Sequence, residues 1–135
     1  VVEVGGAGIG LATCYDLRFP ALFTRLARLG AEVIVVPASW APGQNKIHQW
    51  RTLATARAMD STCFVVACGQ SRPSDSEDSR PTGVGHSLVV DPLGTVVLEL
   101  DEAPELAFVD LNLTDVARAR ESMPVLRNAR SFEES

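Results

Sequence analysis

Basic residues are scarce in this sequence of 135 residues, and only one of them, Lys46, is a lysine. The 12 lysine and arginine side chains are outnumbered by 17 aspartate and glutamate side chains, which gives a net charge of -5. A surface that binds nucleic acid needs an excess of positive charge, so this balance argues against nucleic acid as a partner. No apolar run reaches the roughly 18 residues that cross a bilayer, so we expect no membrane partner.

Cysteine and histidine are also few, with three and two residues respectively. Three cysteines do not make a disulfide framework in a chain of this length. Cys63 and Cys68 fall in one predicted strand at an odd spacing, which directs them to opposite faces, so they should not form a disulfide. The cysteines and histidines show no metal-ligand spacing. We therefore expect reduced thiols, a cytoplasmic location, no bound metal and no cofactor.

Apolar residues recur with strand and helix periods along the chain. The pattern predicts strands at residues 1–4, 9–13, 33–36, 63–68, 87–90, 96–100 and 106–111, and helices at 20–29, 47–61 and 113–121. An exposed loop is expected at 71–82, where proline, serine and charged residues collect. Early alternation of strands and helices favours parallel strands, and the later hairpins favour antiparallel ones. We therefore expect an α/β (α+β mixed) fold: a mixed sheet with helices on one face and an apolar second face that needs a covering layer.

Cys14 stands out because a predicted strand ends at it and a helix is expected just after it. Side chains at the carboxyl end of a central strand face the crevice where open α/β sheets bind ligands. The unpaired N–H groups of a helix start favour a thiolate, the nucleophilic form of cysteine, and could hold an oxyanion. Free cysteine is also among the most frequently buried residue types. From its position alone, Cys14 is equally well interpreted as a nucleophile or as a buried structural residue.

The segment around this cysteine reads Gly-Leu-Ala-Thr-Cys-Tyr-Asp-Leu-Arg-Phe-Pro over residues 10–20. It strongly resembles the nucleophile segment of the nitrilase superfamily, the carbon–nitrogen hydrolases. The resemblance continues in order with Pro-Ala-Ser-Trp at 37–40, the helix pattern W..L..ARA.(E/D) at 50–60, Gly-His-Ser at 85–87, Asp-Pro-Leu-Gly at 91–94, and residues 120–127. It covers nearly the whole chain, and it favours Cys14 as the nucleophile.

The resemblance implies an αββα four-layer sandwich, of which this chain would form half or more. It implies hydrolysis of a small amide or nitrile, in which the cysteine attacks the carbon and water then hydrolyses the thioester or thioimidate. The backbone N–H of Tyr15, the residue after the nucleophile, would hold the oxyanion. The resemblance also implies assembly into homo-oligomers.

In this family the general base, a glutamate, and a lysine that stabilises the intermediate both precede the cysteine. Only 13 residues precede Cys14 here, and they contain one carboxylate, Glu3, and no lysine. Lys46 follows the cysteine, so we do not assign it the catalytic role. Ala21 also stands where relatives usually carry glutamate. We therefore expect residues 1–135 to be a single carbon–nitrogen hydrolase domain that is truncated at its N-terminus.

Four further residues are candidates for positions in or around the site. Asp16 is interpreted as a brace of the turn around Cys14, because a buried charge needs a partner. Arg18 is interpreted either as a similar brace or as a contact to a substrate carboxylate. Trp40 could line the substrate pocket or fill the core, and Arg57 is expected to form a structural ion pair.

These expectations leave hypotheses of different classes open. The first is an amidase-type carbon–nitrogen hydrolase that needs neither metal nor cofactor. The second is a non-catalytic half-domain that buries its open sheet against a partner. A third is a family member that transfers the acyl group to an amine instead of water. His48 and His86 are expected to form structural hydrogen bonds rather than a Cys–His dyad.

Overall fold

The computed structural model describes residues 1–72 and 82–130. Its strands are β1 (Val2–Val4), β2 (Ala7–Leu11), β3 (Val33–Ala38), β4 (Phe64–Gly69), β5 (Leu88–Val90) and β6 (Val96–Glu99). Its helices are the 3-10 helix η1 (Cys14–Arg18) and the α-helices α1 (Pro20–Arg28), α2 (Lys46–Ser61), α3 (Thr114–Ser122) and α4 (Val125–Asn128). None of the helices in these two ranges is long and apolar enough to cross a membrane.

The six strands form one mixed sheet in the order β1-β2-β3-β4-β5-β6. β2, β3 and β4 are parallel, with Ile9 paired with Val33 and Val33 with Phe64. β1 pairs antiparallel with β2 at one side, and β5 and β6 continue antiparallel at the other. The carboxyl ends of the three parallel strands therefore meet at one edge of the sheet, which is the edge that the chain reaches just before Cys14.

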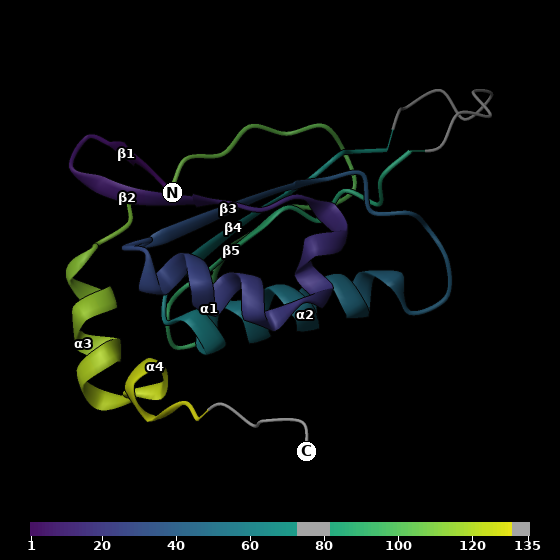
Figure 1. The fold of residues 1–135 in the computed structure, drawn as a ribbon. Coiled ribbons are helices and arrows are strands. Elements are labelled where there is room, and N and C mark those ends of the chain that lie inside the picture. Colours follow the sequence, from purple (N-terminus) through teal and green to yellow (C-terminus); the bar gives the residue numbers. More distant parts are fainter. Residues whose placement is uncertain (73–81, 131–135) are drawn as a thin grey trace, which may run out of the picture.

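The helices α1 and α2 cover one face of the sheet (Figure 1). The core lies between them and the sheet because residues at alternate strand positions, such as Ile34, Val36 and Val65, point toward the helices. Trp50 of α2 is fully buried in this core, and its indole N–H donates to the carbonyl of His86 over 2.7 Å. The apolar stripe that predicted this helix is therefore the stripe that packs on the sheet.

Closeness between β2 and the turn after α1 depends on glycine. A Cβ on Gly8 would lie 2.0 Å from the carbonyl oxygen of Gly30, which is closer than atoms can approach. Gly30 itself has a φ of +96°, so it ends α1 in a conformation that other residues rarely adopt. The two glycines let α1 return to the sheet directly beside β2.

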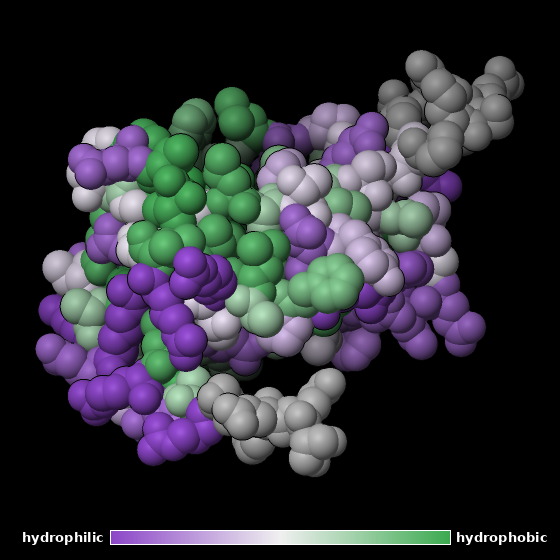
Figure 2. Space-filling model, in the orientation of Figure 1, coloured by the Kyte–Doolittle hydropathy of each residue, from purple (hydrophilic) through white to green (hydrophobic). Residues whose placement is uncertain are grey.

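The second face of the sheet is only partly covered. Val116 of α3 packs there against Val33 and Phe64, at the starts of β3 and β4. Further along, Val4 and Leu11 are 60% and 59% exposed. Figure 2 shows hydrophobic side chains gathered over the region where β1 and β2 lie. The expected fold class, an α/β fold with a mixed sheet, is confirmed. α1 and α2 lie on one face as expected, and α3 adds a contact on the second face.

The strand predicted at 106–111 is wrong. This segment is extended but forms no bridge, and Leu106 and Phe108 are 80% and 88% exposed. Strand propensity is not sufficient, because a strand exists only where a neighbouring strand completes its hydrogen bonds. Neither β1 nor β6, the outer strands of the sheet, pairs with the segment 106–111. The loop expected at 71–82 falls mostly on residues 73–81, outside the described residues.

Candidate active site

Cys14 lies in a sharp turn at the carboxyl end of β2. The strand ends at Leu11, earlier than expected, and the N–H of Ala12 makes one more sheet-like bond to the carbonyl of Val35 at 3.1 Å. Cys14 is then the first residue of the 3-10 helix η1, whereas the α-helix begins only at Pro20. The expected direct passage from strand to α-helix is therefore replaced by a tight intermediate turn.

The backbone at Cys14 adopts a φ of +44°, which is uncommon for any residue except glycine. The turn that holds it is closed twice between Thr13 and Asp16. The N–H of Asp16 donates to the carbonyl of Thr13 at 2.9 Å, and the N–H of Thr13 donates to the Asp16 carboxylate at 2.8 Å. Strained residues held by their surroundings concentrate at functional sites, and a nucleophile on a strained strand-to-helix turn is a recurring arrangement.

The N–H of Tyr15 follows directly after the cysteine. Within residues 1–72 and 82–130 it donates no hydrogen bond, because the first N–H groups of a helix have no partner inside that helix. Its side chain is 63% exposed and meets Phe19 edge to face, with ring centroids 5.7 Å apart. A backbone donor is therefore available beside the Cys14 thiol, as an oxyanion site requires.

A hollow of about 420 Å³ opens beside Cys14. Its walls come from the carboxyl ends of β2, β3 and β4 and the residues after them: Thr13, Cys14, Pro37, Ala38, Ser39, Cys68, Gly69 and Gln70. The lining contains two thiols but no carboxylate, imidazole or amine. Among the described residues, this cleft (the Cys14 cleft) therefore offers thiols and backbone N–H groups, but none of the carboxylate, imidazole or amine groups that most often act as general base.

Arg18 and Trp40, the two candidates for substrate contacts, do not line the Cys14 cleft. The Arg18 guanidinium donates to the side-chain oxygen of Gln49 on α2 at 2.8 Å and lies 5.2 Å from the Trp40 ring. Trp40 is 4% exposed, and its indole N–H donates to the carbonyl of Lys46 at 2.9 Å. These contacts connect η1 and the loop after β3 to the start of α2, as a brace would.

The remaining candidates also have contacts away from the Cys14 cleft. Arg57 is 7% exposed and pairs with Asp60 at 3.4 Å, which is the ion pair expected for it. His86 accepts the indole hydrogen bond of Trp50 on its carbonyl, and neither His86 nor His48 lines the cleft. The residues that the structure gathers around Cys14 are thus Asp16, by its carboxylate, and Tyr15, by its N–H.

The three cysteines are all free, and they differ in exposure. Cys63 is buried and Cys68 is exposed, so the prediction that they point to opposite faces is confirmed. The Cys63 thiol donates to the carbonyl of Ala31 at 3.1 Å, and burial raises the pKa of this thiol above its ordinary value of 9.0. Cys63 is therefore a structural thiol, whereas Cys68 shares the cleft with Cys14.

Cys68 is the residue of the candidate site that the sequence analysis does not single out. The strand predicted at 63–68 includes it, and strand alternation places it on the face opposite Val65 and Ala67. What the sequence did not provide was the strand order: β4 lies two strands from β2, so its carboxyl end borders the same crevice.

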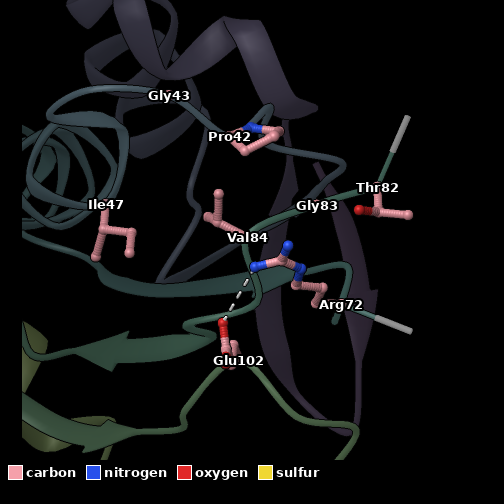
Figure 3. A pocket seen from close by; sticks show the side chains of 8 residues that line it. All are labelled: Pro42, Gly43, Ile47, Arg72, Thr82, Gly83, Val84 and Glu102. Atoms are coloured by element: carbon pink, nitrogen blue, oxygen red, sulfur yellow. Dashed lines mark ion pairs between the residues drawn. The ribbon is translucent and has the colours of Figure 1, made fainter. Parts of the chain in front are cut away.

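A separate pocket of about 190 Å³ lies near the start of α2 and shares no lining residue with the Cys14 cleft. Figure 3 shows Pro42, Ile47 and Val84 on its apolar side and the Arg72–Glu102 ion pair, with atoms 4.0 Å apart, on its polar side. Among the described residues its lining contains no cysteine, and its one hydroxyl group is that of Thr82. A thiolate is a stronger nucleophile than a neutral hydroxyl, so the Cys14 cleft is the better candidate for covalent chemistry.

An open mixed sheet, with a cysteine on a strained turn where its parallel strands end, defines an α/β protein. The sequence profile of the carbon–nitrogen hydrolases matches residues 1–121. The chain belongs to this family, as its motifs indicated.

Relatives and solved structures agree with this assignment. A hydrolase of Mycobacterium tuberculosis is 49% identical over an alignment of 138 residues. The alignment covers 98% of this chain and 49% of the relative. Deaminated glutathione amidase of Escherichia coli O157:H7 is 40% identical over 130 residues, or 96% of this chain and 47% of the enzyme. The crystal structure of Saccharomyces cerevisiae Nit3, a member of the nitrilase superfamily, superposes with a TM-score of 0.77 at 33% identity. That superposition covers 87% of this chain and 42% of Nit3. The chain therefore spans about half the length of the curated relatives it matches.

Proposed function

We propose that this chain carries the nucleophile of an amide hydrolase and that Cys14 is this nucleophile. The observation that supports the proposal most directly is the strained turn at Cys14, with a free N–H on Tyr15 and an open cleft beside the thiol. The same elements would stabilise the attack of a sulfur atom on a carbonyl carbon and the negative charge that develops on its oxygen.

The proposed reaction has two halves. The Cys14 thiolate forms a bond to the carbonyl carbon, and the N–H of Tyr15 donates to the resulting oxyanion. The C–N bond then breaks, the amine leaves with a proton, and a thioester remains on Cys14. Water attacks this thioester, which releases the carboxylic acid and restores the thiol.

Amides are the preferred substrate class in this proposal, because the similar enzymes are named as amidases that act on deaminated glutathione. A nitrile would follow the same course through a thioimidate. Among the described residues, the lining of the Cys14 cleft contains no carboxyl, imidazole or amine group to protonate the departing amine. General acid–base assistance contributes on the order of 10²–10⁴-fold, so we expect amide turnover only when a further part of the protein supplies that group.

The missing base also supports a second candidate: that the chain as it stands is a non-catalytic half that must associate before it works. The two candidates are separated with an acyl donor whose leaving group needs no proton. A p-nitrophenyl ester of a small carboxylic acid releases a stable phenolate, so acylation of Cys14 should proceed without a general acid. Mass spectrometry after acid quench should find the acyl group on the peptide that contains Cys14.

Two variants make this experiment decisive. Cys14→Ala should lose the adduct, and Cys68→Ser should keep it, because Cys68 shares the cleft but does not lie on the strained turn. Amide turnover by the same chain should be absent, and turnover abolished by Cys14→Ala would refute the non-catalytic candidate. An adduct only on Cys68 would refute the assignment of Cys14. Adding an amine and identifying the product separates transfer to the amine from hydrolysis.

A further inference from the structure

Cys68 is the side chain through which β4 reaches the Cys14 cleft. In the parallel pairing of β3 and β4, Cys68 lies opposite Pro37, which also lines the cleft. The next residue, Gly69, has no side chain, and a Cβ there would lie 2.2 Å from the carbonyl oxygen of Gly85. Of these two neighbouring residues, Cys68 is therefore the one with a side chain beside the cleft.

The same thiol also borders a second hollow of about 190 Å³, on the other side of β4. Its lining includes Ser71 after β4, Ser87 before β5, and Asp101 and Pro104 after β6. Among the described residues, Cys68 and Gly69 are the two that line both spaces. Since Gly69 has no side chain, Cys68 is the one side chain that the two hollows share.

The backbone around Cys68 is fixed from both sides. The Ser87 hydroxyl accepts from the N–H of Gly69 at 3.0 Å, and the N–H of Gln70 donates to the carbonyl of Ala38 at 2.8 Å. The carbonyl of Gln70 accepts from the N–H of Gly85 at 2.9 Å. A change in side-chain size at position 68 would therefore alter the width of the cleft, because the strand cannot shift to absorb it.

The two thiols do not act as a disulfide pair in this arrangement. Cys14, just after β2, and Cys68, in β4, are both free thiols, and β3 lies between the two strands. Cys68 consequently contributes size and an apolar surface to the cleft, not a bond to Cys14.

We propose that Cys68 is a specificity-determining residue: its side chain sets how large a group can lie beside the Cys14 thiol and how far that group extends toward the second hollow. This inference rests on the proposed role of Cys14 and adds a size limit to it. A larger residue at position 68 would fill part of the space beside the Cys14 thiol, and a smaller one would widen that space toward the second hollow.

The test compares two alkylating reagents on the full chain: iodoacetamide, and the same reagent with a phenyl ring on its nitrogen. The background is Cys68→Ser, which keeps the size of the side chain but does not react. The quantity measured is the ratio of the two labelling rates at Cys14, taken from peptide mass spectrometry. One methylene in a pocket changes selectivity by tenfold or more, so Cys68→Phe should lower the phenyl reagent's relative rate by about tenfold. Cys68→Ala should raise it.

The matched control is Val4→Phe in the Cys68→Ser background. It also enlarges an exposed apolar side chain on the uncovered face, at the opposite end of β2, and should leave the ratio unchanged. A ratio in both Cys68→Phe and Cys68→Ala that stays within about twofold of Cys68→Ser would overturn the inference. If Cys68→Phe fails to fold, by circular dichroism, Cys68→Ala alone decides. The ratio does not depend on whether Cys14 is activated, so a failure of the proposed function shows separately, as slow labelling by both reagents.

Discussion

At the scale of single residues, the strained backbone angle of the turn and the hydrogen bonds that hold the turn belong to different residues. Cys14 carries the positive φ, and Asp16 closes the turn with its carboxylate and its N–H. The first N–H groups of η1 have no acceptor within that helix, so the N–H of Tyr15 is available to a group that lies beside the sulfur. The physical question is whether this arrangement makes the thiol reactive.

We expect Cys14 to alkylate faster than Cys68 at neutral pH. Access alone predicts the opposite order, because Cys14 is half-buried and Cys68 is exposed. Brief treatment of the folded chain with iodoacetamide, followed by peptide mass spectrometry, gives both rates in one sample. Cys63 should remain unlabelled because it is buried. Equal rates at Cys14 and Cys68 would count against an activated thiol.

Removing the brace should loosen the turn. Asp16→Ala deletes the acceptor of the Thr13 N–H, and loss of such a capping contact costs about 1 kcal/mol of the free energy of unfolding. The same change should slow Cys14 labelling, because the N–H groups no longer hold one geometry. Urea unfolding measures the first effect and mass spectrometry the second.

Asp115→Ala is the control for this prediction. It removes an exposed carboxylate that pairs with Arg118 at 3.0 Å, and exposed pairs contribute roughly 0–1 kcal/mol. Labelling of Cys14 should be unchanged in it. Asp16→Ala with native stability and native labelling would show that the carboxylate does not support the turn.

At the scale of elements, α3 fastens two turns at the starts of β3 and β4. The Arg120 guanidinium donates to the carbonyl of Ala31 at 2.8 Å and to the Thr62 hydroxyl at 3.3 Å. Cys63 lies between these contacts, and its burial outweighs the opposing effects of Ser61 and Arg120 on its pKa, which is raised. Because Cys63 is buried beside Arg120 of α3, the pH dependence of the free energy of unfolding is a measure of this burial.

The sign follows from the raised pKa of Cys63. The unfolded chain loses the thiol proton at a lower pH than the folded chain does. The stability is therefore fully present below the ordinary pKa of 9.0 and declines as the pH rises from there toward the folded-state pKa. Cys63→Ala should flatten this decline in urea unfolding between about pH 8 and pH 10, whereas Cys68→Ala should keep it. An unchanged slope in Cys63→Ala would show that another group causes the decline.

The segment 106–111 and α3 give opposite expectations for apolar residues close in sequence. Phe108→Ser should leave the urea midpoint unchanged, because the ring is 88% exposed. Val116→Ser should cost about 2 kcal/mol or more, because Val116 is 2% exposed and its replacement buries a hydroxyl. Comparable losses in both variants would mean that the segment packs against the sheet in solution.

An element could be predicted from the sequence where the residues that determine its structure lie within the element itself. The helix at 46–61 was predicted nearly to the residue, because the stripe that includes Trp50 and Ala54 is encoded in its own spacing. The 106–111 segment misled, since alternation reports strand propensity but not the presence of a partner. The 3-10 turn at Cys14 and the contribution of Cys68 depend on one backbone angle and on strand order, which the pattern of residues does not contain.

At the scale of the whole molecule, the decisive feature is the uncovered face of the sheet. Val4 and Leu11, on β1 and β2, are 60% and 59% exposed on the face away from α1 and α2. A large contiguous apolar patch is rare on a monomer and marks a surface that another layer covers. On this ground we expect this face to pack against another layer of protein, which a second copy of the chain can supply.

We therefore expect the 135-residue chain to self-associate when it is prepared alone, with a mass by light scattering above the 14.5 kDa of one chain. Leu11→Glu combined with Val4→Lys should shift the distribution toward the monomer, because two charges would have to be buried in the contact. Met59→Glu is the matched control: Met59 is also an exposed apolar residue, at 39%, but it lies on α2, on the covered side. A monodisperse monomer at all concentrations would contradict the association. An equal shift toward the monomer in Met59→Glu would instead place the contact on the helices. The uncovered face of the sheet would then be exposed to solvent without driving association.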